Sequence, residues 1–172
     1  RKDINLTEIG NLDWFVPETN LVDGDPWDID EKAGANYVDS SAFRMSFYNW
    51  YGDFGYDRVF FNWSDGTNFP VIGTDRDRND GRWGSIASVT TKVDASVKHV
   101  YLWISGWNCS YNMAVMDSKN NIIFDEEIVQ AQGNNQPFEL NFAVNCATEE
   151  TLTFVLYGTS SDNCSIVAMA VS

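Results

Sequence analysis

The sequence predicts an all-β fold, a single antiparallel β-sandwich domain of the jelly-roll type that spans residues 1–172. Segments in which apolar and polar residues alternate recur along the chain, and this is the period of a half-buried strand. Gly and Asx turns separate these segments, and no long window has the apolar period of a helix. The length suits one domain with a sizeable core, and the chain shows no internal repeat or linker.

The expected strands follow one another from the first third of the chain to its end. Alternation predicts strands over residues 43–48, 59–64, 97–105, 138–145 and 152–157, and the apolar run 165–171 predicts a strand that completes the sandwich. Turn residues separate them, at Asp23-Gly24, Asp65-Gly66, Asp80-Gly81, Asn120-Asn121 and 133–135. Residues 28–35 are expected to form one helical turn and little else.

The segment 97–105 shows how alternation assigns faces. Its core-facing residues are expected to be Val100, Leu102 and Ile104. The opposite face then carries His99, Tyr101 and Trp103. A polar strand face with two large aromatic residues is either a platform for a ligand or a surface that a loop covers, and alternation leaves both readings open.

The charge of the chain excludes several kinds of partner. Its 11 Lys and Arg residues stand against 25 Asp and Glu residues, a formal net charge of −14. Such a field repels polyanions, so we expect no nucleic-acid partner. No apolar run approaches the ~18 residues of a membrane-spanning helix, so we expect no membrane insertion. Because the chain opens at Arg1 without Met, we expect it to be covalently linked to other modules in a longer protein.

Two sequence motifs resemble those of a β-sandwich module found in large secreted bacterial proteins, where it is often attached to glycoside hydrolases. The first is Leu6-Thr7 followed by Gly10 and Asp13-Trp14, and the second is Trp63-Ser64-Asp65-Gly66-Thr67. A weaker order of residues continues the pattern, namely Thr74, Gly84, Thr91, Val93 and Tyr101 to Gly106-Trp107. The resemblance extends from residue 4 to the end and implies a non-catalytic, carbohydrate-binding-module-like domain in an extracellular or cell-surface setting.

The chain departs from the family pattern after Asp13-Trp14. In the family a second Trp usually follows closely, whereas here residues 15–18 intervene and Trp27 comes only after an acidic segment. The resemblance therefore implies the fold and a glycan-related setting, and it does not imply particular binding residues.

Candidate binding residues come instead from the chemistry of sugars. Sugar rings have apolar C–H faces that stack on Trp and Tyr, and hydroxyls that hydrogen-bond to Asp, Asn, Gln or Arg. The densest such segment is 47–56, a second is 75–83, and a third lies around Trp107. The candidate ligands of a polysaccharide or oligosaccharide are Trp50, Tyr51, Asp53, Tyr56, Arg82, Trp83 and Trp107. The alternatives are that segment 47–56 caps one end of the sandwich and that segment 75–83 is a solvated hairpin loop.

No cofactor is expected, although a structural calcium ion is left open. Asp75, Asp77, Asn79 and Asp80 resemble the opening of an EF-hand loop, but Gly81 comes one position late and Ile86 stands where the loop needs Glu. A second acidic cluster contains Asp23, Asp25, Asp28 and Asp30. Solvated acidic turns are the simpler reading of both segments.

Neither the cysteines nor the histidine indicates a catalytic or metal site. The three cysteines, Cys109, Cys146 and Cys164, allow at most one disulfide and lack metal-knuckle spacing, so we expect buried, inert thiols. His99 is the only histidine and stands beside no nucleophile motif. We therefore expect no catalytic residues and no enzyme.

Two functions compete at this point. The domain either binds a glycan on exposed aromatic side chains, or it is a structural or adhesive spacer of a bacterial surface protein whose aromatic residues are all internal. The aromatic content of 15% fits both, because an aromatic-rich β core consumes large side chains as well.

Overall fold

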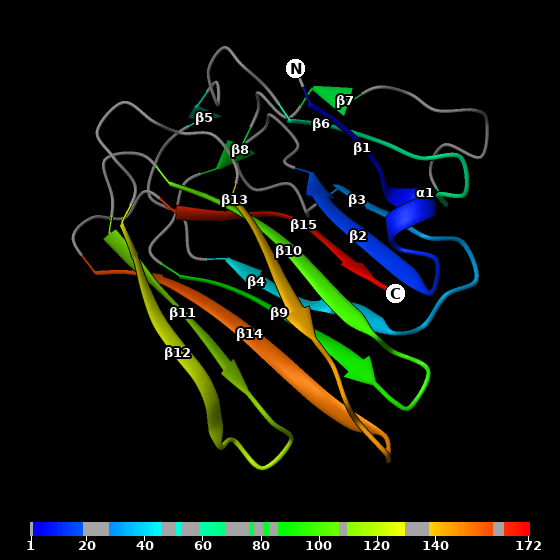
Figure 1. Cartoon of the computed structure of the whole chain (residues 1–172). Helices are drawn as coiled ribbons and strands as arrows, with labels where there is room; N and C mark the ends of the chain where they lie inside the picture. Colours follow the sequence, from blue (N-terminus) through cyan, green and yellow to red (C-terminus); the bar gives the residue numbers. More distant parts are fainter. Residues whose placement is uncertain are drawn as a thin grey trace.

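A computed structural model describes residues 2–18, 28–45, 51–52, 59–67, 76–77, 81–82, 86–106, 110–129, 138–159 and 164–172. These residues form two five-stranded antiparallel sheets that pack face to face, as the sequence predicts (Figure 1). Smaller β elements and one short helix lie outside the pair of sheets.

The first sheet has the strand order β13-β10-β15-β2-β3. Its strands are β2 (Asp13–Glu18), β3 (Asp28–Glu31), β10 (His99–Gly106), β13 (Phe138–Ala143) and β15 (Cys164–Val171). The expected strands at 97–105, 138–145 and 165–171 are thus confirmed. The helical turn expected at residues 28–35 is wrong, because residues 28–31 pair with β2 as a strand, and such pairing overrides local propensity.

The second sheet has the strand order β12-β11-β14-β9-β4. Its strands are β4 (Val38–Met45), β9 (Ile86–Val93), β11 (Ser110–Met116), β12 (Ile122–Val129) and β14 (Glu150–Gly158). The strands expected at 43–48 and 152–157 lie within or overlap β4 and β14. Asn120, with φ of 63°, turns the chain between β11 and β12.

The main core fills the space between the two sheets. The first sheet contributes Val100, Leu102 and Ile104 of β10, which are fully buried as alternation predicts. The second contributes buried side chains of β4, β9, β11 and β14, among them Phe43, Val89, Tyr111, Met113, Phe154 and Leu156. Period-two alternation on both sheets therefore makes one continuous apolar layer.

A third layer covers the outer face of the first sheet. It contains β1 (Lys2–Asn5), α1 (Leu6–Ile9), β6 (Val59–Asn62) and β7 (Arg76–Asp77), and β1 pairs with β6 in parallel (Figure 1). Asn5 caps α1 by accepting hydrogen bonds from the backbone N–H groups of Thr7 and Glu8.

A second apolar core lies under this layer. It contains Ile4, Leu6, Trp14, Val16, Phe61, Trp63, Trp103, Val167, Ala168 and Ala170. Because this core and the main core lie on its two sides, β15 is buried along its whole length. The apolar run at residues 165–171 is explained by two cores rather than one.

Candidate functional site

Two of the candidate binding residues pair with each other through their backbones. Tyr51 belongs to β5 (Tyr51–Gly52) and Arg82 to β8 (Gly81–Arg82), and these two short strands are antiparallel, with Tyr51 opposite Arg82 and Gly52 opposite Gly81. β8 also contacts β15, which attaches the pair to the first sheet. The structure therefore pairs residues 51–52 of the first candidate segment with residues 81–82 of the second, two segments that the sequence identified separately.

The remaining candidate residues lie outside the described part of the chain. They are Trp50, Asp53, Tyr56, Trp83 and Trp107. In the sequence, Trp50 directly precedes Tyr51 and Trp83 directly follows Arg82. Aromatic residues of both segments are thus the immediate chain neighbours of one backbone pair. Such a pair can combine stacking faces from one segment with the guanidinium hydrogen bonds of the other.

The outer face of β10 carries a row of three rings. The His99 and Tyr101 ring centroids are 5.7 Å apart, and those of Tyr101 and Trp103 are 6.0 Å apart with nearly parallel planes. Trp103 is only 1% exposed because Phe61 and the third layer cover it. His99 and Tyr101 remain partly exposed. The face is therefore covered at Trp103 and open at His99.

Polar side chains of β13 lie beside this ring row. His99 Nδ1 and Asn141 Oδ1 are 2.9 Å apart, and Trp103 Nε1 donates a 3.2 Å hydrogen bond to Glu139 Oε2. Glu139 and Asn141 are both exposed. A half-buried Tyr101 ring with an amide and a carboxylate beside it is a second place where a polar ligand with an apolar face can bind. Alternation identified its rings, but the contribution of β13 depends on strand order, which alternation does not supply.

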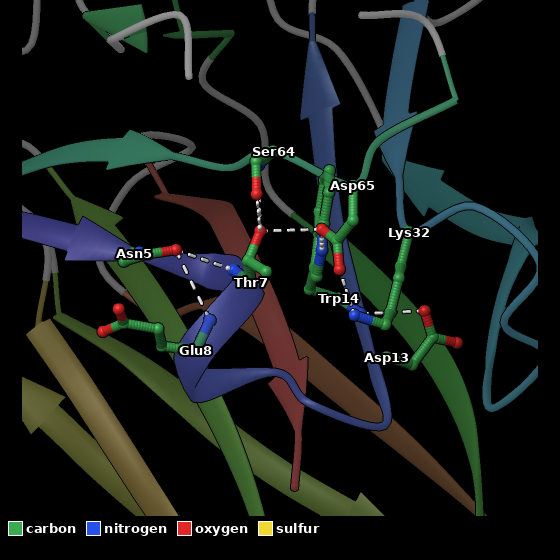
Figure 2. Close-up of polar contacts among 8 residues, drawn as sticks. All are labelled: Asn5, Thr7, Glu8, Asp13, Trp14, Lys32, Ser64 and Asp65. Atoms are coloured by element: carbon green, nitrogen blue, oxygen red, sulfur yellow. Dashed lines mark hydrogen bonds and ion pairs between the residues drawn. The ribbon is translucent and has the colours of Figure 1, made fainter. Parts of the chain in front are cut away.

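The two motifs that carry the family resemblance meet at Asp65. Asp65 Oδ1 accepts a 2.8 Å hydrogen bond from Trp14 Nε1 and another of 2.8 Å from Thr7 Oγ1. Lys32 Nζ pairs with Asp65 Oδ2. These four residues, the Asp65 cluster, join α1, β2, the end of β3 and the segment after β6 (Figure 2). Residues of the two motifs therefore make contacts that hold the third layer on the first sheet.

Other residues of the two motifs support the same contacts. The Trp14 and Trp63 rings pack with centroids 5.0 Å apart, and both side chains are buried. A Cβ on Gly66 would lie 2.7 Å from Trp63 Nε1, so a side chain there would displace the indole. Asp13, 2% exposed, accepts hydrogen bonds from the backbone N–H groups of Trp14, Tyr37 and Val38. None of these roles requires a ligand.

The two motif aspartates have pKa values shifted in opposite directions. Burial raises the pKa of Asp13, and its three backbone hydrogen bonds only partly offset this. Burial also acts to raise the pKa of Asp65, but the hydrogen bonds from Lys32, Thr7 and Trp14 outweigh it and the pKa is lowered. Asp65 is therefore the charged partner of Lys32.

The described residues contain no group of three or more His, Cys, Asp or Glu side chains placed to hold a metal ion. Asp23 and Asp25, and Asp75, Asn79 and Asp80 of the EF-hand-like segment, lie outside this part of the chain. Asp30 is a buried residue of strand β3, so reading it as part of a solvated acidic turn is wrong. The remaining candidate ligands of a calcium ion therefore belong to segments 19–27 and 75–80.

The structure describes two of the three cysteines. Cys164 is buried in the main core, and the half-buried Cys146 donates a hydrogen bond to the carbonyl oxygen of Thr148. Cys109 lies outside the described residues. Cys164 is therefore buried as expected, whereas Cys146 is only half-buried.

Comparison of the sequence with known protein families and with characterised proteins finds no match. Among solved structures, the fold resembles a family 35 carbohydrate-binding module from an environmental isolate, with 15% identity and a TM-score of 0.43 over 82% of this chain and 90% of that chain. A family 6 carbohydrate-binding module has 12% identity and a TM-score of 0.39 over 83% and 92%. A family 35 module from Cellvibrio japonicus Abf62 has 14% identity and a TM-score of 0.35 over 76% and 93%. At these values the likeness assigns neither a family nor a site.

Where the structure describes the chain, no helix has the length and apolarity needed to cross a membrane. The helix α1 has only four residues.

Proposed function

We propose that this chain is a non-catalytic carbohydrate-binding module that binds a polysaccharide on the aromatic side chains of segments 47–56 and 75–83. The observation that carries the proposal is the backbone pairing of Tyr51 with Arg82. Each segment combines aromatic residues with hydrogen-bonding residues, and a sugar needs both kinds in one place. Their pairing supports one shared site rather than two unrelated loops.

The distribution of tryptophan supports the same site. Of the seven tryptophans in the chain, Trp14, Trp63 and Trp103 are buried in the second core. Trp50 and Trp83 belong to segments 47–56 and 75–83, whose glycines and Asp residues predict loops. Segments that connect strands usually lie on the surface and carry binding residues. An extracellular or cell-surface location belongs to this proposal, because polysaccharides are found there.

Affinity electrophoresis of the wild-type chain tests the proposal. Gels that contain xyloglucan, β-glucan, mannan, pectin or mucin should retard the chain in at least one case. In that gel, Trp50→Ala and Arg82→Ala should each weaken binding by about 1–3 kcal/mol, since loss of a stacking ring or of a bidentate donor has this effect at the centre of an interface. The melting temperature of both variants should stay near that of the wild type.

A matched variant separates this site from the face of β10. Asn141→Ala removes an exposed polar group beside the ring row and should leave binding unchanged. If Trp50→Ala still bound the polysaccharide and Asn141→Ala did not, the binding site would be on β10 and β13 instead. A Trp50→Ala protein that melts early would instead identify Trp50 as a core residue and overturn the proposed site.

A spacer role is the second candidate, and the buried aromatic residues favour it. Trp14, Trp63 and Trp103 show that aromatic content alone does not indicate a binding surface here. A structural or adhesive spacer would migrate at the same rate in every polysaccharide gel.

A further inference from the structure

A cavity of about 370 Å³ opens between the edge strands of the two sheets, β12 and β13. Its walls are mainly apolar and come from both sheets and from the segment after β13. Phe124 of β12 and Phe142 of β13 meet edge to face, with ring centroids 5.2 Å apart. Phe142 in turn contacts the buried Phe154, 5.3 Å away. The volume lies in the range of small-molecule sites in proteins.

A β-bulge brings an additional apolar side chain to this edge cavity. Val115 pairs with Phe124 and Met116 pairs with Ile122, which leaves Ile123 as the extra residue of β12. Ile123 lines the cavity although its side chain is 58% exposed. Bulges of this kind redirect a side chain at a sheet edge. The mouth of the cavity therefore keeps an apolar wall in contact with water.

Two carboxylates stand among the lining residues, and the turn at residues 117–121 holds both in place. Asp117 accepts hydrogen bonds from the backbone N–H groups of Lys119 and Asn121 and from Asn121 Nδ2. Ser118 donates to Glu150 Oε1 from its backbone and from its hydroxyl. The hydrogen bonds that Glu150 accepts within the described residues all reach Oε1, so Oε2 can accept one from a ligand.

The charge of the lining selects the kind of ligand. Its charged residues are Asp117 and Glu150, and it contains no Lys, Arg or His. These hydrogen bonds favour the ionised form of both carboxylates. An anionic ligand is therefore repelled, whereas a cationic group can pair with the carboxylates of Asp117 and Glu150 at the edge of the apolar walls.

We propose that the edge cavity binds a small organic cation, an aliphatic or arylalkyl ammonium compound. The apolar tail lies between Phe124, Phe142 and Ile123, and the ammonium group donates to Glu150 Oε2 beside Asp117. This site is separate from the proposed polysaccharide site, because no lining residue belongs to β5 or β8.

Titration calorimetry of the full chain with alkylammonium chlorides tests the proposal. Affinity should rise about fourfold for each methylene from propyl- to hexylammonium, as tail area leaves water. Hexanoate should not bind, and 1-hexanol should bind more weakly than hexylammonium. No saturable binding of hexylammonium, or equal binding of hexanoate, would overturn the proposal.

Two pairs of variants locate the site. Ile123→Ser should weaken hexylammonium and hexanol alike, whereas Val129→Ser, an exposed position on the same strand outside the lining, should weaken neither. Glu150→Gln should weaken hexylammonium about two- to fivefold and leave hexanol unchanged, whereas Glu127→Gln on β12 should change neither. Equal effects within either pair would show that the ligand binds elsewhere.

Discussion

At the scale of single residues, the two motif aspartates Asp13 and Asp65 have different structural roles. Asp13 organises backbone, since its carboxylate accepts the N–H groups of Trp14, Tyr37 and Val38 where β2 meets the start of β4. Asp65 organises side chains from three separate segments. Because the pKa of Asp13 is raised in the folded state, its ionisation lowers the free energy of unfolding as pH rises past the ordinary pKa. The pKa of Asp65 is lowered, so its ionisation has the opposite effect and stabilises the fold.

Asp65→Asn is expected to lower the free energy of unfolding by about 1–3 kcal/mol at neutral pH. The NH₂ group of Asn would face Thr7, Trp14 or Lys32, which are themselves hydrogen-bond donors. The Asp65 contribution is fully present above the ordinary pKa of 3.8 and is lost as pH falls through the lower folded value. Urea unfolding should therefore show a smaller difference in the free energy of unfolding between variant and wild type at a pH below the folded pKa of Asp65 than at neutral pH. A gap that widens in acid would contradict the assigned direction.

Asp13→Asn is expected to destabilise the fold by about 1–3 kcal/mol, since the Asn amide group cannot accept the backbone N–H bonds that the second carboxylate oxygen receives. Glu8→Gln, on the exposed surface of α1, is the matched control and should change the melting temperature little. Equal melting temperatures for the two variants would show that the three backbone bonds contribute nothing net.

At the scale of strands, period-two alternation predicted the elements whose faces differ and missed those that pairing stabilises. The 97–105 segment has one fully apolar face, so its core residues were identified correctly. The acidic segment that forms β3 has no such face, and only its pairing with β2 makes it a strand. The adjacency of Tyr51 and Arg82 and the bulge at Ile123 depend on which strands meet, which local sequence does not encode.

The edge strand β12 carries a run of three acids that protects the sheet. Among the described strands, β12 pairs only with β11, and its exposed residues include Ile122, Ile123 and Val129. Asp125, Glu126 and Glu127 separate these apolar residues with like charges. An edge that is apolar and uncharged pairs with other chains, so the acids oppose self-association.

Neutralising this edge is expected to produce oligomers. A chain with Asp125→Asn, Glu126→Gln and Glu127→Gln should elute as dimers or larger species in size-exclusion chromatography with light scattering, because repulsion between apposed β12 strands is removed. Removing three acids elsewhere, by Glu8→Gln, Asp39→Asn and Glu149→Gln, gives the same net charge and should stay in the wild-type state. Identical behaviour of the two triple variants would contradict a specific role for β12.

At the scale of the whole molecule, three layers share two apolar cores. The main core joins the sheets, and the second core joins the first sheet to β1, α1 and β6. Most of the stability is expected from this apolar burial, because it is the dominant favourable term in folding.

Chelation with EDTA is therefore expected to lower the melting temperature of the whole chain only slightly. Scanning calorimetry with and without EDTA measures the difference. A drop of many degrees that Ca²⁺ restores and Mg²⁺ does not would instead show a structural calcium site in the acidic segments 19–27 or 75–80, because an ion bound only to the native state stabilises it by mass action.

The position of β15 also determines when the protein can fold during its synthesis. β15 lies between β10 and β2 and contributes side chains to both cores, yet it is the last described strand to leave the ribosome. A nascent chain that ends before Cys164 has every other described strand but no central one in its first sheet. Trp14 and Phe15 on β2 and Trp103 on β10 then lack the side chains that β15 contributes to their cores. Apolar surfaces left partly exposed in this way bind chaperones or aggregate. Folding of the two cores is thus tied to synthesis of β15, and translation pauses before that point prolong the partial exposure of these three aromatic residues.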